Sequence, residues 1–448
     1  MTTTLSEDKT GVYNSVEDAV HASKVAFSHL HKSIGLRDKI VKSIRSHSLK
    51  NCKKFSRMAI EETGYGRYDD KIKKNLLAIN STPGVEDINP SAYTGEHGTT
   101  LVECAPYGLI AAVTPSTNPS ETIINNAISM IAAGNAVVFS PHPSAKNTTT
   151  FCVSVINNAI VEAGGPQNLI TCLGNPTKEN SEELMRHPDI RLNVVTGGEG
   201  AVRRAMSVNK RCVAAGPGNP PVIVDETANI AEAARDIVEG ASFDNGIVCI
   251  LEKEVIAVDS IADHLIDEMR MSKCYLASEK EMNELLKFVF TDMSSDGKHG
   301  RINRQFVGKN ASVLLKQIGV GVSDDIRLII TETDRDNPLV WTEMLMPILP
   351  IVRVNNVDDA IGFAIEVEQK CYHTAIMHSK NIDKLSKMSY ECDCTIFVSN
   401  APSLAGLGYN GEGYTSYTIS SPTGEGITSA KSFTRQRRCT LAKSFRII

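Results

Sequence analysis

The chain has 448 residues, 42% of them hydrophobic, which is enough to bury the cores of two or three globular domains. Its net charge is −5, and its basic residues are scattered apart from "RQRR" at 435–438, so the composition argues against a nucleic-acid partner. No apolar run reaches the ~18 residues that a transmembrane helix needs, so we expect no membrane segment.

Residues 15–62 predict two helices, because "VHASKVAFSHL" and "LRDKIVKSIRSHSL" place apolar residues at helical spacing. From Tyr107 the pattern changes. Short β-branched runs ("GLIAAVTP", "NAVVFSP", "NLITCLG", "IRLNVVTGG") alternate with helical segments that stop at Gly134 and at Gly164. This alternation predicts βαβ units and a parallel sheet with helices on both faces.

A second alternating block runs from "KEVIAVDS" to "CTIFVSN" and includes a helix predicted over 357–369, so we expect another α/β layer. The segments "TGEHGTTLVECAPYG" and "RCTLAKSFRII" predict strands that lie outside the first sheet.

Glycine-containing turns are the candidate phosphate-binding elements. The single G-x-G-x-x-G, at residues 406–411, precedes "EGYTSYTIS", which has no helical pattern, so we interpret it as a false match. Better candidates are the loops that follow strands of the first block, because ligands of open α/β sheets bind there. These loops are "TPSTNPS" (114–120), "SPHPSA" (140–145) and "TGGEG" (196–200).

The eleven cysteines follow no signal peptide, which favours a reducing cytoplasm. Cys392 and Cys394 form a C-x-C pair, but no second pair or nearby histidine completes a metal site, so we predict buried thiols. Cys249, in "SFDNGIVCILEKEV", is different: a helix predicted over 230–245 ends before Gly246, which places this thiol beyond a helix end and exposed between the two blocks. A thiolate there can attack an aldehyde, and the thiohemiacetal can pass hydride to a nicotinamide.

Long motifs, among them "PYGLIAAVTPSTNPSETIINNAISMIAAGNAVVFSPHP", "VTGGEGAVRRAM" and "AAGPGNPPVIVDETANIAEAARDIVEGASFDNGIVCI", resemble the aldehyde dehydrogenase superfamily. More narrowly, they resemble the CoA-acylating propionaldehyde and acetaldehyde dehydrogenases of bacterial microcompartments. The resemblance covers the chain from about residue 11 to its end. It implies two doubly wound α/β domains and a small bridging sheet: a cofactor-binding domain over 1–215, interrupted by bridging strands at about 93–105, a catalytic domain over 216–420, and a C-terminal bridging segment over 421–448.

The resemblance also implies the site. It places the nucleophile at Cys249, the oxyanion donor at Asn118 or, without a gap, at Thr117, and a base for the CoA thiol at His373, although a lone histidine at a strand edge is usually structural. We favour Asn118 as the donor, because its side-chain amide can donate to the oxyanion alongside the Cys249 amide. The cofactor contacts that it implies are Thr114, Pro115, Ser140, His142, Thr196, Gly197, Gly198, Gly216 and Glu343, the last at the nicotinamide ribose.

Two positions depart from the hydrolytic relatives. The glutamate that activates water in those enzymes falls on Ala214, and the lysine that holds the adenosine ribose falls on Ser140. The resemblance therefore implies that NAD oxidises a short-chain aldehyde, propionaldehyde before acetaldehyde, to its acyl-CoA. The alternatives are a hydrolytic enzyme, which Ala214 argues against, an acyl-phosphate reductase, and a catalytically silent microcompartment protein, against which Cys249 and Glu343 argue. These residues do not separate NAD from NADP.

The resemblance further implies a homo-oligomer, a dimer or tetramer, and a cytoplasmic enzyme inside a bacterial microcompartment. Shell proteins and an alcohol dehydrogenase are the partners that it suggests. Members of this group often carry an amphipathic N-terminal extension that targets them to the shell, and "MTTTLSEDKTGVY" predicts no such helix.

Overall fold

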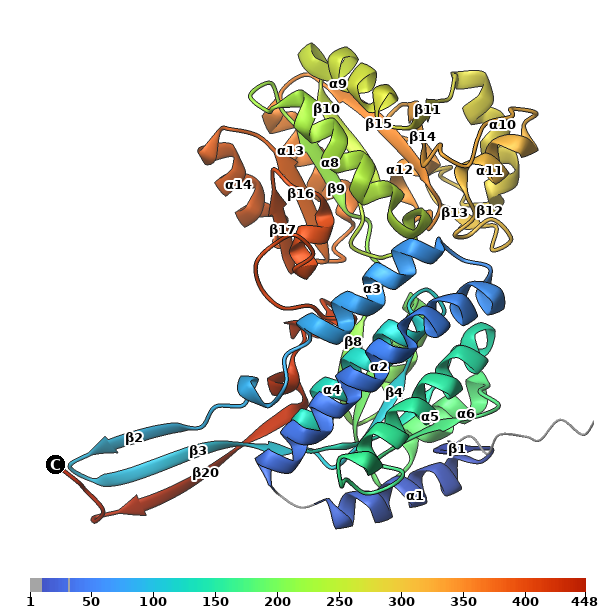
Figure 1. Ribbon diagram of the computed structural model, residues 1–448. Helices are drawn as coiled ribbons and strands as arrows, with labels where there is room; N and C mark the ends of the chain where they lie inside the picture. Colours follow the sequence, from blue (N-terminus) through green and yellow to red (C-terminus); the bar gives the residue numbers. More distant parts are fainter. Residues whose placement is uncertain (1–9, 31–32) are drawn as a thin grey trace, which may run out of the picture. The chain divides into compact units, whose positions relative to one another are not determined.

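The computed structural model describes residues 10–30 and 33–448, and the chain forms two compact units (Figure 1). The first unit contains the chain up to residue 62, residues 74–215 and residues 414–448; the second contains residues 63–73 and 216–413. The expectation about a targeting helix falls on residues 1–9, outside the described residues. The three functional domain ranges stay predictions, because contacts alone assign no role.

A parallel six-stranded sheet forms the centre of the first unit, in the order β1-β6-β5-β4-β7-β8. Its strands are β1 (Val12–Tyr13), β4 (Leu109–Val113), β5 (Ala136–Ser140), β6 (Ile170–Leu173), β7 (Ile190–Thr196) and β8 (Arg211–Ala215). The chain runs outward from β4 through β5 to β6 and then returns to the other side of β4 as β7. The strand order therefore reverses between β4 and β7, which is the point where open α/β sheets bind ligands.

Helices pack on this sheet because its strands are continuous apolar runs that need cover on both faces. They are α1 (Val16–His29), α2 (Ile34–Thr63), α4 (Pro119–Ala132), α5 (Lys146–Glu162), α6 (Lys178–Arg186) and α7 (Glu199–Ser207), with most of α3 (Tyr68–Ser81). The two helices predicted over 15–62 are α1 and α2. Helix α4 begins with a proline in its first turn and is buried along its whole length, which explains its mostly apolar sequence.

A separate three-stranded antiparallel sheet extends from the first unit as a ribbon (Figure 1). It joins β2 (Ser91–Gly95), β3 (Gly98–Pro106) and β20 (Thr434–Ala442), so the two segments predicted to lie outside the main sheet pair with each other. A short hairpin of β18 (Ile419–Ser420) and β19 (Gly426–Ile427) precedes β20.

A parallel seven-stranded sheet forms the centre of the second unit, in the order β11-β14-β15-β10-β9-β16-β17. Its strands are β9 (Pro221–Val224), β10 (Glu254–Val258), β11 (Cys274–Leu276), β14 (Leu328–Glu332), β15 (Ile348–Val354), β16 (Thr374–His378) and β17 (Ile396–Ser399). Beside it lies a small hairpin of β12 (Phe290–Met293) and β13 (Gly300–Ile302).

The helices of this unit are α8 (Ile230–Ser242), α9 (Asp259–Met271), α10 (Glu279–Val289), α11 (Ala311–Gln317), α12 (Pro338–Trp341), α13 (Val357–Glu368) and α14 (Ile382–Cys392). The connection from β9 to β10 crosses the sheet in one direction, and that from β15 to β16 crosses it in the other. Right-handed crossovers therefore place α8 and α13 on opposite faces. The second unit is thus doubly wound, as predicted.

Two local features bear on the predictions. The helix predicted over 230–245 ends earlier, at Ser242, because Asp244 and Asn245 have left-handed backbones (φ 46° and 56°). No helix follows the glycines of residues 406–411, so that motif lacks the strand-to-helix setting of a dinucleotide fingerprint. No helix among the described residues is long and apolar enough to span a membrane.

Candidate active site

Two predicted catalytic residues and one predicted cofactor contact precede neighbouring strands of the second sheet. Cys249 precedes β10, Glu343 precedes β15 and His373 precedes β16. Since β15, β10, β9 and β16 are adjacent and parallel, their amino ends lie along one edge of the sheet. The topology therefore brings these loops together at the amino-terminal edge, opposite to the edge where open α/β sheets usually bind ligands.

A left-handed turn leads into the candidate nucleophile, Cys249. Asp244, Asn245 and Gly246 all have positive φ, which is unfavourable for the two non-glycine residues and persists only where neighbours hold it. The Asp244 carboxylate accepts from the Arg67 amide at 2.7 Å and from buried Lys71 Nζ at 3.1 Å. The Asn245 side chain bonds the Arg67 Nε at 2.8 Å and the Gly308 carbonyl at 2.8 Å. These bonds hold the chain reversal that precedes Cys249.

Cys249 is half-buried, whereas the sequence predicted an exposed thiol. The difference arises because the turn folds the loop back against its own unit. A β-carbon on Gly218 would lie 2.9 Å from the Cys249 carbonyl oxygen, and one on Gly246 would lie 2.7 Å from the Met346 carbonyl oxygen. The nucleophile loop is therefore closely packed at both of these glycines.

His373 is fully buried at the start of β16. Its amide donates to Glu368 Oε1 at 2.8 Å, and its Nδ1 lies 2.9 Å from Thr374 Oγ1. Its Nε2 has no hydrogen-bond partner among the described residues. Burial lowers the pKa of His373 to about 4, and the charge of Lys253 adds to this shift. The ring is thus neutral at physiological pH, with one nitrogen free to interact with a bound ligand.

Glu343 is partly buried in the loop before β15. Burial raises the pKa of its carboxyl, while the nearby Lys253 charge and a hydrogen bond from the Gly218 amide oppose the rise. Gly218 thus adjoins three groups, since a β-carbon there would also lie 2.9 Å from His373 Cγ. Neither Gly218 nor Lys253 was singled out from the sequence.

The predicted cofactor contacts of the first unit follow β4, β5 and β7, which are neighbours in its sheet. Thr114 and Pro115 follow β4. The Thr114 hydroxyl is buried without a partner among the described residues, as expected of a group that awaits a ligand. Ser140 ends β5 and is fully buried, with its hydroxyl 2.7 Å from that of Ser181; His142 caps the short helix that follows.

The turn after β7 contributes Thr196, Gly197 and Gly198. Gly198 caps α7, and a β-carbon there would meet nothing within 4 Å, so the backbone is open to a ligand at a helix N-terminus. Together with the orphan hydroxyl of Thr114 on the neighbouring strand, this turn fits a dinucleotide at the switch point. Gly216, which follows β8, belongs to the second unit.

Asn118 caps α4 in the loop after β4. Its Oδ1 accepts from Lys74 Nζ at 2.6 Å, and its Nδ2 lies 3.2 Å from Thr117 Oγ1. Because Lys74 has only donors, it fixes which end of the amide is oxygen, and the NH₂ group at the other end donates to Thr117 Oγ1. This arrangement favours Asn118 as a hydrogen-bond donor. Lys74 was not singled out from the sequence.

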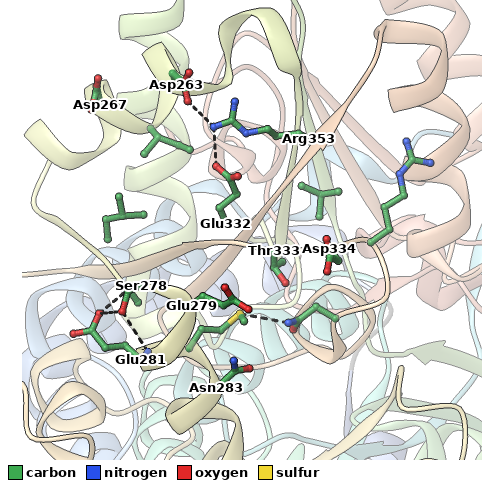
Figure 2. Close-up of a pocket in the computed structure, with 17 residues that line it drawn as sticks. Asp263, Asp267, Ser278, Glu279, Glu281, Asn283, Glu332, Thr333, Asp334 and Arg353 are labelled. Carbon is green, nitrogen blue, oxygen red and sulfur yellow. Dashed lines mark hydrogen bonds and ion pairs between the residues drawn. The ribbon is translucent and has the colours of Figure 1, made fainter.

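A pocket of about 1100 Å³ lies at the carboxyl ends of β11, β14 and β15 (Figure 2). None of the 17 residues that line it is a predicted site residue. Part of its charge is paired within the lining, since Arg353 Nη2 contacts Asp263 at 2.5 Å and Glu332 at 2.8 Å, and the Ser278 hydroxyl donates to Glu281. This end of the second sheet is therefore an acidic surface without any of the predicted site residues.

The remaining cysteine pair is structural in character. Cys392 and Cys394 have their sulfurs 3.4 Å apart, and the hydrogen bond with Cys392, together with burial, raises the pKa of Cys394. Among the described residues, no group of three or more His, Cys, Asp or Glu side chains is arranged to hold a metal ion.

Comparison with known proteins places this geometry in a family. Residues 3–415 match the aldehyde dehydrogenase family. The acetaldehyde dehydrogenase (acetylating) EutE of Salmonella typhimurium is 48% identical over 439 residues, which are 98% of this chain and 94% of that protein.

Solved structures of related enzymes are also similar to this chain. The Rhodopseudomonas palustris propionaldehyde dehydrogenase with bound CoA and an acylated cysteine is 47% identical, with a TM-score of 0.94 over 98% of this chain and 99% of that one. An engineered glycolyl-CoA reductase with bound NADP⁺ gives the same identity, TM-score and coverage. A propionaldehyde dehydrogenase from the fucose utilisation microcompartment of Clostridium phytofermentans is 44% identical, with a TM-score of 0.95 over 98% and 100% of the chains.

These matches confirm the predicted fold class and the predicted resemblance. With the family match spanning residues 3–415, the chain belongs to the aldehyde dehydrogenase family.

Proposed function

We propose that this protein is a CoA-acylating aldehyde dehydrogenase, which oxidises a short-chain aldehyde to its acyl-CoA. The observation that carries the proposal is the pairing of a candidate nucleophile, Cys249, with an alanine, Ala214, where hydrolytic relatives have their water-activating base. Ala214 is fully buried in β8, and its amide bonds Thr423 Oγ1 at 3.0 Å. A methyl group there has no affinity for a proton.

In the first half-reaction the Cys249 thiolate attacks the aldehyde carbonyl and forms a thiohemiacetal. The Asn118 side-chain amide and the Cys249 backbone amide donate to the developing oxyanion. Collapse of that oxyanion releases hydride and leaves an acyl thioester on Cys249. A bound nicotinamide dinucleotide supplies the hydride acceptor. Thr114, Pro115, Ser140, His142, Thr196, Gly197, Gly198, Gly216 and Glu343 are the residues that we propose to hold it, and NAD is our choice between the two dinucleotides.

In the second half-reaction the CoA thiol attacks the acyl thioester. We propose that His373 Nε2, which is buried, neutral and without a hydrogen-bond partner in the described part of the chain, accepts the thiol proton. A thiolate needs less help than water to attack a thioester, so CoA is the better acceptor where no base serves water. The bound CoA and acylated cysteine of the Rhodopseudomonas enzyme support this order of events.

The experiment is a mixing-order assay. With propanal and NAD but no CoA, we expect about one NADH per active subunit and then a stall; adding CoA should restart turnover and give propanoyl-CoA by mass spectrometry. Sustained turnover to free propanoate without CoA would indicate the hydrolytic alternative, and a requirement for phosphate in place of CoA would indicate an acyl-phosphate reductase. Ethanal run in parallel decides chain length, since relatives named for both aldehydes are similar to this chain.

We also propose that the protein forms a homo-oligomer through the β2-β3-β20 ribbon and resides in a bacterial microcompartment, with shell proteins and an alcohol dehydrogenase as partners. The ribbon supports the first part, because its outer strands expose backbone edges and apolar side chains such as Tyr93 and Leu441. The microcompartment origin of the Clostridium enzyme supports the second. Sedimentation of the purified protein measures its mass in solution and so tests whether it forms an oligomer.

A further inference from the structure

A buried lysine lies directly beneath the nucleophile loop. Lys253 is 4% exposed, and its amide bonds the Pro220 carbonyl at 3.0 Å at the start of β10. Its Nζ donates to the carbonyl of Gly246 at 2.6 Å and to that of Val248 at 3.5 Å. These two carbonyls belong to the turn that ends one residue before Cys249, so the lysine ties the loop to the strand that follows it.

The Lys253 side chain has no carboxylate in direct contact among the described residues. Its hydrogen-bond acceptors among the described residues are backbone carbonyls. Burial lowers the pKa of Lys253, and the nearby negative charges that oppose this include Glu343 and Cys249. A buried cation without a contacting anion is unfavourable, and a nearby thiolate would relieve that cost.

We propose that Lys253 is a positioning residue for Cys249: its ammonium fixes the turn that carries the nucleophile and supplies the positive charge that favours the thiolate. This rests on the proposed role of Cys249 as nucleophile.

The groups that face this ammonium come from several loops. They are Cys249, Glu252, Glu254, Glu343 and His373. Of these, Glu252 has a pKa raised to about 7 by burial, so it titrates in the range where the thiol is measured. A test of the charge of Lys253 must therefore separate its effect from that of Glu252.

The test follows alkylation of Cys249 by iodoacetamide against pH, quantified on the Cys249 peptide by mass spectrometry. Lys253→Met keeps the length of the side chain and removes its charge. We expect the midpoint of the rate profile to rise by about one pH unit or more, so that alkylation at pH 7 falls about tenfold or more and the curves converge at high pH. The same shift should persist in a Glu252→Gln background. An unchanged midpoint, or an equal fall in rate at every pH, would overturn the proposal.

Two further variants keep the result interpretable. Lys253→Gln retains a donor for the turn without the charge, so it should show the same midpoint shift; a midpoint like that of the wild type would overturn the role of the charge. Lys210→Met removes a partly buried lysine whose Nζ also donates to a backbone carbonyl, that of His187 in the first unit, and should leave the midpoint in place. If Lys210→Met moves it as far, the effect belongs to any such lysine and the proposal fails. Alkylation needs no aldehyde, cofactor or CoA, so it is independent of the proposed acyl acceptor.

Discussion

Gly218 lies against His373: a β-carbon on Gly218 would stand 2.9 Å from Cγ of the imidazole. The same β-carbon would stand 2.9 Å from the Cys249 carbonyl oxygen, and the Gly218 amide bonds Glu343. The absence of a side chain at this one position therefore lets three loops of the second sheet approach one another.

Gly218→Ala should lower kcat/KM by about 10–100-fold, because the added methyl must displace the nucleophile loop or the histidine. Steady-state assays of NADH formation measure this change in kcat/KM. The matched control is Gly362→Ala in α13, where a β-carbon meets nothing within 4 Å; this change should leave activity intact and stabilise the helix slightly. Similar activity in both variants would show that the close approach has no catalytic consequence.

Cys249→Ala should abolish aldehyde-dependent NADH formation while the fold and cofactor binding persist, as checked by circular dichroism and cofactor titration. Cys152→Ala is the control, since Cys152 is a fully buried core thiol in α5 whose pKa burial raises. That variant should keep its turnover number and lose some stability, because even small buried side chains contribute to packing. Wild-type turnover in Cys249→Ala would refute the nucleophile assignment.

Asn118→Asp should lower kcat by about 10²–10³-fold, because it keeps the size of the side chain and the contact with Lys74 but removes the NH₂ donor. Thr117→Val, which removes only a hydroxyl, should have a small effect. Pre-steady-state NADH formation measures both variants. If the threonine variant is the slower of the two, the oxyanion donor is Thr117.

His373→Ala should slow steady-state turnover by about 10²-fold or more and spare the first burst of NADH, because oxidation precedes CoA entry. His378→Ala is the control: His378 is also buried, with Nε2 unpartnered among the described residues and its pKa lowered to about 4. It should reduce stability without changing the ratio of burst to steady state. A fall of less than tenfold in His373→Ala, or an equal fall in both phases, would make His373 structural.

Glu252→Gln should stabilise the protein increasingly as pH rises from about 5 to 8. The wild-type carboxyl is fully buried, accepts from Ser403 at 2.8 Å, and has its pKa raised from 4.5 to about 7. In that window the folded state binds a proton that the unfolded state has lost, so stability falls as pH rises through it. Glutamine does not titrate, so its contribution to stability is independent of pH. The difference in unfolding free energy between Glu252→Gln and the wild type should therefore grow by up to about 3 kcal/mol across this range. Denaturant unfolding at several pH values measures this difference in unfolding free energy. A difference that does not change with pH would contradict the raised pKa.

The order of strands and helices could be predicted from the sequence because both blocks alternate β-branched runs with helical segments. Cys249 could be distinguished from ten other cysteines by the long motifs around it and by the chain reversal that Gly246 predicts before it, although the helix itself ends at Ser242. The strand-end turns at Thr114, Ser140 and Thr196 could be identified for a related reason, since a loop that follows a strand is a local feature of the sequence.

Only the tertiary structure brought Lys253 and Gly218 to the loop of the candidate nucleophile, Cys249. Their loops precede β10 and β9, and they meet the loops of Glu343 and His373 because the strand order places β15, β10, β9 and β16 side by side. That order is set by long-range pairing, which the sequence does not display. The burial of Lys253 and the half-buried state of Cys249 follow from the same packing. The surroundings of a side chain depend on segments that are distant in the sequence, and those of Cys249 depend on the loop that ends at His373.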